Sequence, residues 1–117
     1  MKHSPSLKTL VMFGATAFAV SLSSAVLADA DGDAAQALAK KNDCLKCHAV
    51  DKTKKGPSYK KIAEKYKGKP DGEEKCIKNI TSGQKVKLED GSEEDHKIIG
   101  TKDQHEMKNL CSWILSR

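Results

Sequence analysis

The chain contains two cysteines that are separated by two residues and followed at once by a histidine, in the run Cys-Leu-Lys-Cys-His at positions 44–48. This spacing is typical of a covalent c-type haem attachment site. Two thiols about one helical turn apart can each add to one vinyl group of a haem, and the adjacent histidine can bind the iron. The run therefore predicts that Cys44 and Cys47 carry one haem c and that His48 is the proximal ligand of its iron.

Three other interpretations of this run are weaker. A thioredoxin-type redox pair has the same cysteine spacing, but it needs a βαβ pattern around it, and none is visible in the sequence. A zinc site needs a second pair of ligands, whereas the other two cysteines, Cys76 and Cys111, are far from each other in the sequence. Chance is the third interpretation, and the export signal at the N-terminus argues against it.

The N-terminus has the three parts of a secretory signal peptide. Lys2 and Lys8 give a basic start, an apolar run follows over about residues 10–20, and small residues lead to Ala28. We expect cleavage after Ala28, with Ala30 as the alternative. An uncleaved membrane anchor is disfavoured because the apolar run is short and is followed by serines. Export would place the chain where haem is attached and where disulfides can form.

Removal of the leader, residues 1–28, leaves one small domain, residues 29–117. A chain this short has a marginal apolar core, and a covalent haem would give it a large apolar surface to pack around. The leader takes two of the 21 basic side chains with it, which leaves 19 against 16 acidic ones. This mild excess, without interleaved basic and aromatic residues, argues against nucleic acid as a partner. We expect a soluble periplasmic monomer with no stable membrane insertion after cleavage.

Capping residues and apolar spacing predict about four helices. We expect a first helix capped by Asp33, a second over about residues 59–68, a third from Asp71 to Gly83, and a last one capped by Thr101. The stretch between the third and last helices, residues 84–100, is predicted to be an irregular loop with room for a short hairpin. A monohaem protein would have to draw its second iron ligand from such a segment.

With these features the chain resembles the small bacterial class I cytochromes c over essentially all of residues 29–117. The resemblance is carried by the helix that leads into the run at 44–48, by Gly-Pro-Ser-Tyr-Lys at 56–60, and by Leu-Cys-Ser-Trp-Ile-Leu-Ser at 110–116. It implies an all-α cytochrome c fold, with about four helices packed around one covalently attached haem. It also implies electron transfer between redox proteins, without enzymatic turnover.

The resemblance assigns roles to two further residues. In the family, the carbonyl that matches Pro57 accepts a hydrogen bond from the proximal histidine, which would fix the tautomer of His48 and raise its basicity. The tryptophan that matches Trp113 helps to wall the haem pocket. We therefore expect both residues to belong to the cofactor-binding site.

One departure from the family concerns the second ligand of the iron. The family usually supplies a methionine from a Met-Pro segment about fifteen to seventeen residues before the terminal tryptophan, and this chain has no such segment. The corresponding window before Trp113 contains His96, which we predict to be the distal ligand, although a solvated loop residue is the alternative. Met107 is the runner-up, but it lies in the last predicted helix, where a core position explains it. His105, another group or a vacant position are the remaining options.

Cys76 and Cys111 are the second departure, because they occupy positions that are usually apolar in the family. In an exported chain we expect them to form a disulfide that closes a loop of about 35 residues. Two buried free thiols and a reversible redox sensor are the alternatives. Because His96 lies between the two cysteines, the bridge would help to hold it near the iron.

Lysines surround the attachment run, at positions 40, 41, 46, 52, 54 and 55. A basic rim around an exposed haem edge would attract redox partners with acidic docking surfaces, whereas a solvated face is the plainer interpretation. The sequence therefore predicts an exported monohaem one-electron carrier with His/His ligation of iron. The alternative is a haem-based binder or sensor of CO, NO or O2 with a displaceable distal ligand.

Overall fold

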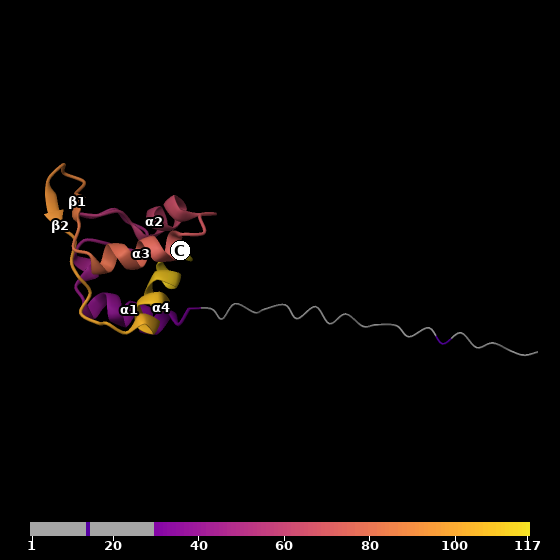
Figure 1. Cartoon of the computed structure of the whole chain (residues 1–117). Helices are drawn as coiled ribbons and strands as arrows, with labels where there is room; N and C mark the ends of the chain where they lie inside the picture. The colour runs from indigo at the N-terminus through magenta and orange to yellow at the C-terminus, as the bar shows by residue number, and fades with distance from the viewer. Residues whose placement is uncertain (1–13, 15–29) are drawn as a thin grey trace, which may run out of the picture.

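The computed structural model describes Gly14 and residues 30–117 (Figure 1). Apart from Gly14, the predicted leader at 1–28 and its cleavage site after Ala28 lie outside the described residues. In chain order the elements are α1 (Gly32–Lys41), the 3-10 turn η1 (Cys44–Lys46), α2 (Tyr59–Tyr66), α3 (Gly72–Thr81), β1 (Lys85–Lys87), β2 (Glu93–Asp95) and α4 (Gln104–Leu115). Within the described residues, every helix is too short or too polar to cross a membrane.

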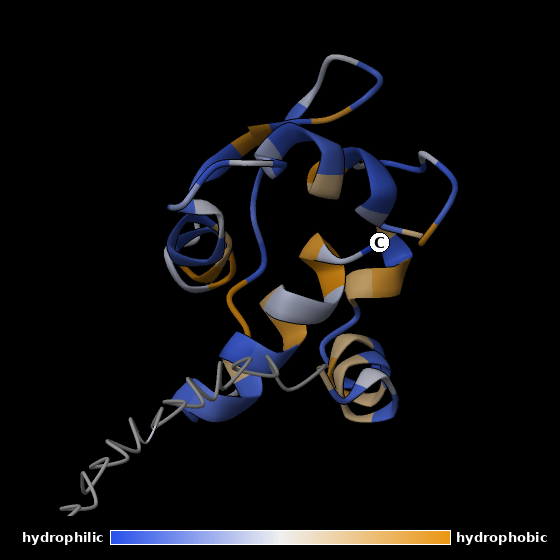
Figure 2. Cartoon of the chain, turned by 90° about the vertical axis from the view of Figure 1, so that its right-hand side faces the viewer, coloured by the Kyte–Doolittle hydropathy of each residue, from blue (hydrophilic) through white to orange (hydrophobic). Residues whose placement is uncertain are grey.

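Helix α4 is the centre of the fold, because α1, α2 and α3 all pack against it. Its apolar residues gather where the helices face one another (Figure 2). On α1, Ala35 and Ala39 are almost completely buried, and their small side chains let the first and last helices approach closely. Leu110 and Ile114 of α4 belong to the same core cluster. The predicted, mainly helical architecture is confirmed.

Two helix starts differ from the prediction. Helix α1 is capped by Asp31, whose carboxylate accepts a hydrogen bond from the backbone N–H of Ala34 at 3.0 Å, and Asp33 lies in the first turn. Helix α4 is capped by Asp103 rather than Thr101. At α1 both candidates are aspartates, and the helix begins two residues earlier than predicted, so Asp33 contributes its charge to the first turn. At α4 the carboxylate of Asp103 accepts from the backbone N–H groups of His105 and Glu106 and interacts favourably with the positive end of the helix dipole, which the Thr101 hydroxyl cannot do equally well.

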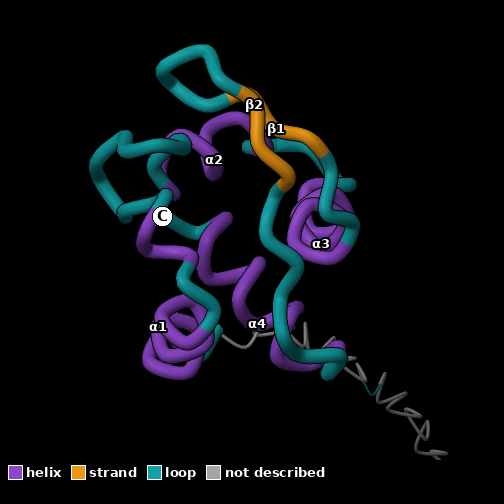
Figure 3. The backbone as a smooth tube through the Cα atoms, turned by 90° about the vertical axis from the view of Figure 1, so that its left-hand side faces the viewer, coloured by secondary structure: helices purple, strands orange, loops and turns teal. Residues whose placement is uncertain are grey.

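The stretch between α3 and α4 contains a short antiparallel hairpin, in which Val86 of β1 lies opposite Glu94 of β2. Its turn includes Gly91, which has a φ of 86°, a backbone conformation that favours glycine. After β2 the chain runs back past α3 towards the start of α4 (Figure 3). This return segment, residues 96–100, brings His96 to the same side of the fold as the attachment run.

Candidate haem-binding site

A cavity of about 850 Å³ lies between η1, α2, α3, α4 and the hairpin. A cavity of this volume can bury most of the surface of a small-molecule ligand. Its wall includes six of the predicted site residues, namely Cys44, Cys47, His48, Pro57, Cys76 and His96. Residues from both ends of the domain therefore meet around one space.

The attachment run forms a single tight turn at the edge of this cavity. Asp43 has a φ of 59°, a conformation that Asp tolerates better than most residues, and it turns the chain from α1 into η1. The backbone N–H of His48 then donates to the carbonyl of Cys44 at 2.9 Å. Both thiols are half-buried, and burial raises the pKa of the Cys44 thiol. The turn places the two sulfur atoms and the histidine on one side of the chain.

The ring of His48 is held from three directions. Its Nδ1 lies 2.7 Å from the carbonyl oxygen of Pro57, and because a carbonyl can only accept, Nδ1 carries the proton. The ring of Tyr59 stacks on it at 5.5 Å between centroids. A Cβ at Gly56 would lie only 2.9 Å from Cε1 of His48, so only glycine leaves room for this ring position. Nε2 remains available for a metal ion.

Burial also favours the form of His48 that binds a metal. Desolvation lowers the pKa of His48, although its hydrogen bond to Pro57 opposes this effect. The neutral imidazole is therefore favoured at neutral pH, and only the neutral ring has a lone pair to donate.

His96 lies across the cavity from His48, with 6.3 Å between the ring centroids and 43° between the ring planes. Its backbone N–H donates to the carbonyl of Gln84 at 2.7 Å, and its Nδ1 donates to the carbonyl of Lys97 at 3.0 Å. As in His48, the remaining ring nitrogen, Nε2, is free to act as a ligand. The structure thus brings the two predicted histidines together with equivalent tautomers.

The other predicted residues lie further from the cavity. Met107 is 2% exposed and belongs to the core cluster, whereas His105 is exposed in the first turn of α4. Trp113 packs edge-on against Tyr59, with 5.6 Å between ring centroids, so it lies behind a residue of the cavity wall. Trp113 therefore contributes by supporting Tyr59, which in turn contacts His48.

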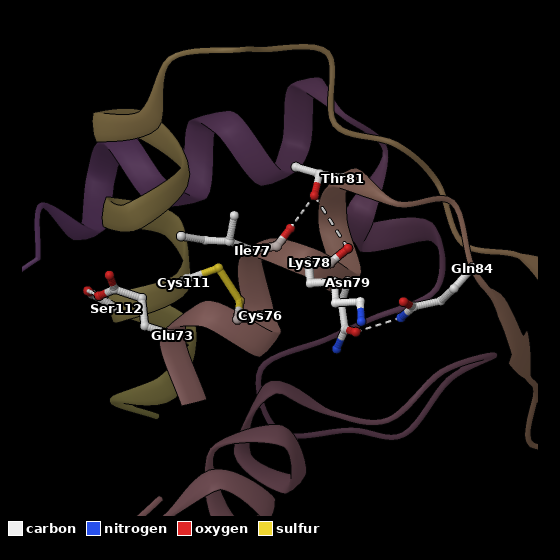
Figure 4. Close-up of a disulfide and its surroundings, with 9 residues drawn as sticks. All are labelled: Glu73, Cys76, Ile77, Lys78, Asn79, Thr81, Gln84, Cys111 and Ser112. Carbon is white, nitrogen blue, oxygen red and sulfur yellow. Dashed lines mark hydrogen bonds between the residues drawn. A yellow bond between two sulfur atoms is a disulfide. The ribbon is translucent and has the colours of Figure 1, made fainter. Parts of the chain in front are cut away.

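A disulfide joins Cys76 of α3 to Cys111 of α4 (Figure 4). Both residues are buried, and Cys76 also lines the cavity. The side chain of Gln84 donates to that of Asn79 on α3 at 2.6 Å, and Figure 4 marks this contact with a dashed line. Because the carbonyl of Gln84 accepts a hydrogen bond from the backbone N–H of His96, these contacts connect α4 through α3 to His96.

Sequence reasoning missed two contributors to the site. The sequence predicts that Tyr59 lies on the apolar face of a helix. Its stacking on His48, however, depends on the direction in which α2 begins after Pro57. Gln84 has no motif around it, and its role arises only from the hairpin that brings His96 back to it. No local signal in the sequence identifies either contact.

Comparison with known proteins now identifies the chain. The family model for cytochrome c matches residues 32–117. Among solved structures, the chain is similar to the class 1 cytochrome MtoD from Sideroxydans lithotrophicus ES-1, with 58% identity and a TM-score of 0.72 over 74% of this chain and 96% of that one. The chain therefore belongs to the cytochrome c family and is a small class I monohaem cytochrome c.

Two curated relatives agree with this assignment. The chain is 33% identical to cytochrome c2 from Rhodocyclus tenuis, over 68% of this chain and 88% of the relative. It is 35% identical to cytochrome c-551 from Allochromatium vinosum, but that match spans 39% of this chain and about half of the relative, 49%. The predicted cytochrome c fold is confirmed, and the homologues support a monohaem electron carrier.

Proteins of this family bind one covalent haem c with its iron, and the site fits that group. The cavity carries two thiols from one turn, and it has a histidine with a free Nε2 beside them. Gly56 is a further sign of fit, because a Cβ there would lie 2.9 Å from Cε1 of His48 and push the ring out of its position beside the thiols. The donor set is thus what a covalent haem needs on its proximal side.

Proposed function

We propose that this cytochrome is an exported one-electron carrier in which His48 and His96 bind the haem iron from opposite sides. The observation that carries the proposal is the 6.3 Å between the two ring centroids. An imidazole nitrogen binds a metal ion at about 2.0 Å, and the ring centre lies about 1 Å further away. Two imidazoles on opposite sides of one iron therefore have ring centres about 6 Å apart.

The hydrogen bonds of the two rings support the same assignment. In each ring Nδ1 donates to a backbone carbonyl, of Pro57 for His48 and of Lys97 for His96. Such a bond orients a ligating imidazole and makes its other nitrogen a stronger donor. Met107, in contrast, would have to leave the core and unwind the first turns of α4 to reach the iron.

In this proposal Cys44 and Cys47 hold the haem through thioether bonds, and the walls of the cavity shield it. The bound haem supplies a one-electron couple of its iron. A thioether ligand favours ferrous iron, whereas a second imidazole favours the ferric form more. We therefore expect a lower reduction potential than in methionine-ligated members of the family.

We further propose that the carrier is a periplasmic monomer, formed by residues 29–117 after removal of the leader, and that it performs no enzymatic turnover. Its partners would be redox proteins with acidic docking surfaces. The six lysines around the attachment run are all exposed, and Leu45 between the two cysteines is 39% exposed. An apolar contact within a basic rim would suit an acidic partner, because the charges steer the encounter while the haem edge stays accessible.

The ligand assignment is tested by replacing His96. We expect His96→Ala to change the low-spin spectrum of the holoprotein to that of an open or high-spin site, which binds CO quickly when reduced. Met107→Leu is the control and should keep the low-spin spectrum. A low-spin spectrum that survives in His96→Ala and is lost in Met107→Leu would reverse the assignment.

The same experiment tests the alternative function, a haem-based binder or sensor of CO, NO or O2. This alternative is favoured by the exposure of Lys97, Ile98 and Gly100 in the segment that carries His96, with Ile98 57% exposed, although Ile99 of the same segment is buried in the core. A carrier should bind CO slowly, because His96 must first leave the iron. Rapid and complete CO binding by the unaltered protein would favour the sensor.

A further inference from the structure

Ile99 anchors the segment at 96–100 in the core cluster, where it is 7% exposed, and hydrogen bonds on both sides of the segment place its other residues. On one side the backbone N–H of His96 donates to the carbonyl of Gln84, at 2.7 Å. On the same side the N–H of Ile99 donates to the carbonyl of Ile80, the last-turn residue of α3, at 2.8 Å. These bonds attach the segment to the end of α3 and to the residue directly before β1.

The opposite side of the segment is attached to the residues directly before the attachment run. The backbone N–H of Gly100 donates to Oδ1 of Asn42 at 2.7 Å. Beside it, Nζ of Lys97 lies 2.9 Å from Oδ2 of Asp43. Since Cys44 follows at once, the stretch that leads into the proximal turn also holds the distal segment.

Both polar atoms of the Asn42 side chain, Nδ2 and Oδ1, form hydrogen bonds between α1 and the segment at 96–100. Asn42 is 7% exposed, and its Nδ2 donates to the carbonyl of Leu38, in the last turn of α1, at 2.9 Å. Because Nδ2 faces an acceptor and Oδ1 faces a donor, only one orientation of the amide satisfies both contacts. The fit is close, since a Cβ at Gly100 would lie 3.1 Å from Oδ1 of Asn42. A buried amide that is satisfied on both sides fixes the geometry of the groups around it.

We propose that Asn42, with the Asp43–Lys97 ion pair beside it, is a positioning residue for the distal ligand. It ties the segment that carries His96 to the proximal turn, and thereby sets how often His96 leaves the iron and admits a small external ligand. The inference rests on the proposed function, in which His96 is the distal ligand. Loss of the tie lets the segment move away from the cavity more often, although the haem and its proximal side stay as they are.

The test is the rate of CO binding to the reduced holoprotein, measured by stopped flow. Loss of one buried hydrogen bond shifts a local equilibrium by about fivefold. We expect Asn42→Ala to bind CO about fivefold faster than the unaltered protein, and Lys97→Met to bind it faster by a smaller factor. The spectrum before CO is added should remain low-spin in both variants.

Two matched controls separate positioning from general destabilisation. Asn109 also connects α1 to α4 through its amide, with two hydrogen bonds to the backbone of Asp31, but it does not touch the distal segment. Lys85 has an exposed ion pair with Asp95 within the hairpin, and its replacement changes the net charge as Lys97→Met does. Asn109→Ala and Lys85→Met should bind CO at the original rate.

Amide hydrogen exchange gives an independent readout. The Gly100 amide should exchange faster in Asn42→Ala than in Asn109→Ala, when both are measured in the oxidised holoprotein. The proposal is overturned if Asn42→Ala matches the unaltered protein in CO rate, or if Asn109→Ala accelerates CO binding equally. If Asn42→Ala yields no holoprotein, Gly100→Ala replaces it in the test, because its new Cβ crowds the same contact. Its CO rate is then compared with those of the same control variants.

Failure of this inference can be distinguished from failure of the ligand assignment. If His96→Ala keeps the original low-spin spectrum, His96 is not the ligand, and the basis of the inference is removed. If His96→Ala opens the site while Asn42→Ala and Gly100→Ala leave CO binding slow, the ligand assignment stands and the positioning role is rejected.

Discussion

At the scale of single residues, the proximal side depends on how closely the backbone approaches the His48 ring. Pro57 offers its carbonyl to Nδ1, and Gly56 lets the ring lie against the chain. These two neighbours do different work, since one orients the imidazole by a hydrogen bond and the other makes space for it. A side chain at position 56 would oppose both effects.

We therefore predict that Gly56→Ala weakens the proximal side. The new Cβ would lie 2.9 Å from Cε1 and 3.3 Å from Nδ1 of His48, so the ring must move. Overpacking of this kind costs about 1–3 kcal/mol of unfolding free energy, measurable by denaturant titration of the holoprotein. The haem spectrum should change as well, because the bond between His48 and Pro57 is disturbed.

Gly91→Ala is the control for this variant. It has open space around its Cβ but a φ of 86°, so it should lose stability through backbone strain alone and keep the haem spectrum. A Gly56→Ala protein with the original spectrum and stability would contradict the role assigned to the glycine.

At the scale of secondary-structure elements, α3 and α4 support the side of the cavity that carries His96. The disulfide joins Cys76 to Cys111, and Gln84 connects the end of α3 to the backbone of His96. The covalent bond therefore acts on the elements from which the hairpin and the return segment start. Its contribution to stability can be separated from its effect on the haem.

We predict that the double variant Cys76→Ala, Cys111→Ala folds and binds haem but loses about 3 kcal/mol of unfolding free energy. The physical reason is that the bridge restricts the unfolded chain over a separation of 35 residues. Guanidinium titration of the oxidised holoprotein measures the loss, and Cys76→Ala alone should be about as unstable as the double variant. Equal stability of the double variant and the unaltered protein would refute this contribution.

Local sequence patterns predict the helices and the motif at 44–48, but they do not predict contacts between segments that are distant in the sequence. The run at 44–48 predicts the haem-attachment residues and the proximal ligand, and the structure places its thiols and imidazole at one cavity, because the whole motif lies within one turn. The spacing of apolar residues predicts the helices, but the predicted capping residues Asp33 and Thr101 are wrong. Asp31 and Asp103 accept the N–H groups at those helix starts. The bond between Asn42 and Gly100 spans 58 positions, and no local pattern indicates it.

At the scale of the whole molecule, the proposed docking to acidic partners depends on how the surface charges are distributed. The lysines around the attachment run are exposed, whereas the acidic residues of the hairpin, at 89, 90 and 93–95, form a separate exposed group. A docking partner would therefore meet a directional charge distribution rather than a uniform one. Such a distribution acts on the rate of encounter more than on the final affinity.

We predict that electron transfer to an anionic oxidant such as hexacyanoferrate(III) slows as ionic strength rises, because salt screens attraction to the lysines. Lys52→Glu and Lys55→Glu should slow the reaction at low salt. Lys108→Glu, the same charge change on α4, should have a smaller effect. Stopped-flow rates at several salt concentrations measure this, and equal effects of the three variants would argue against a basic docking face.

The proposed carrier has two imidazoles bound to one iron on a covalently attached haem. X-ray absorption at the iron edge of the oxidised protein tests this most directly, because it distinguishes nitrogen from sulfur neighbours. We predict nitrogen neighbours alone, with both axial positions filled, for the unaltered protein, and loss of one axial nitrogen in His96→Ala. A sulfur neighbour, or an axial position without a protein ligand in the unaltered protein, would contradict the account.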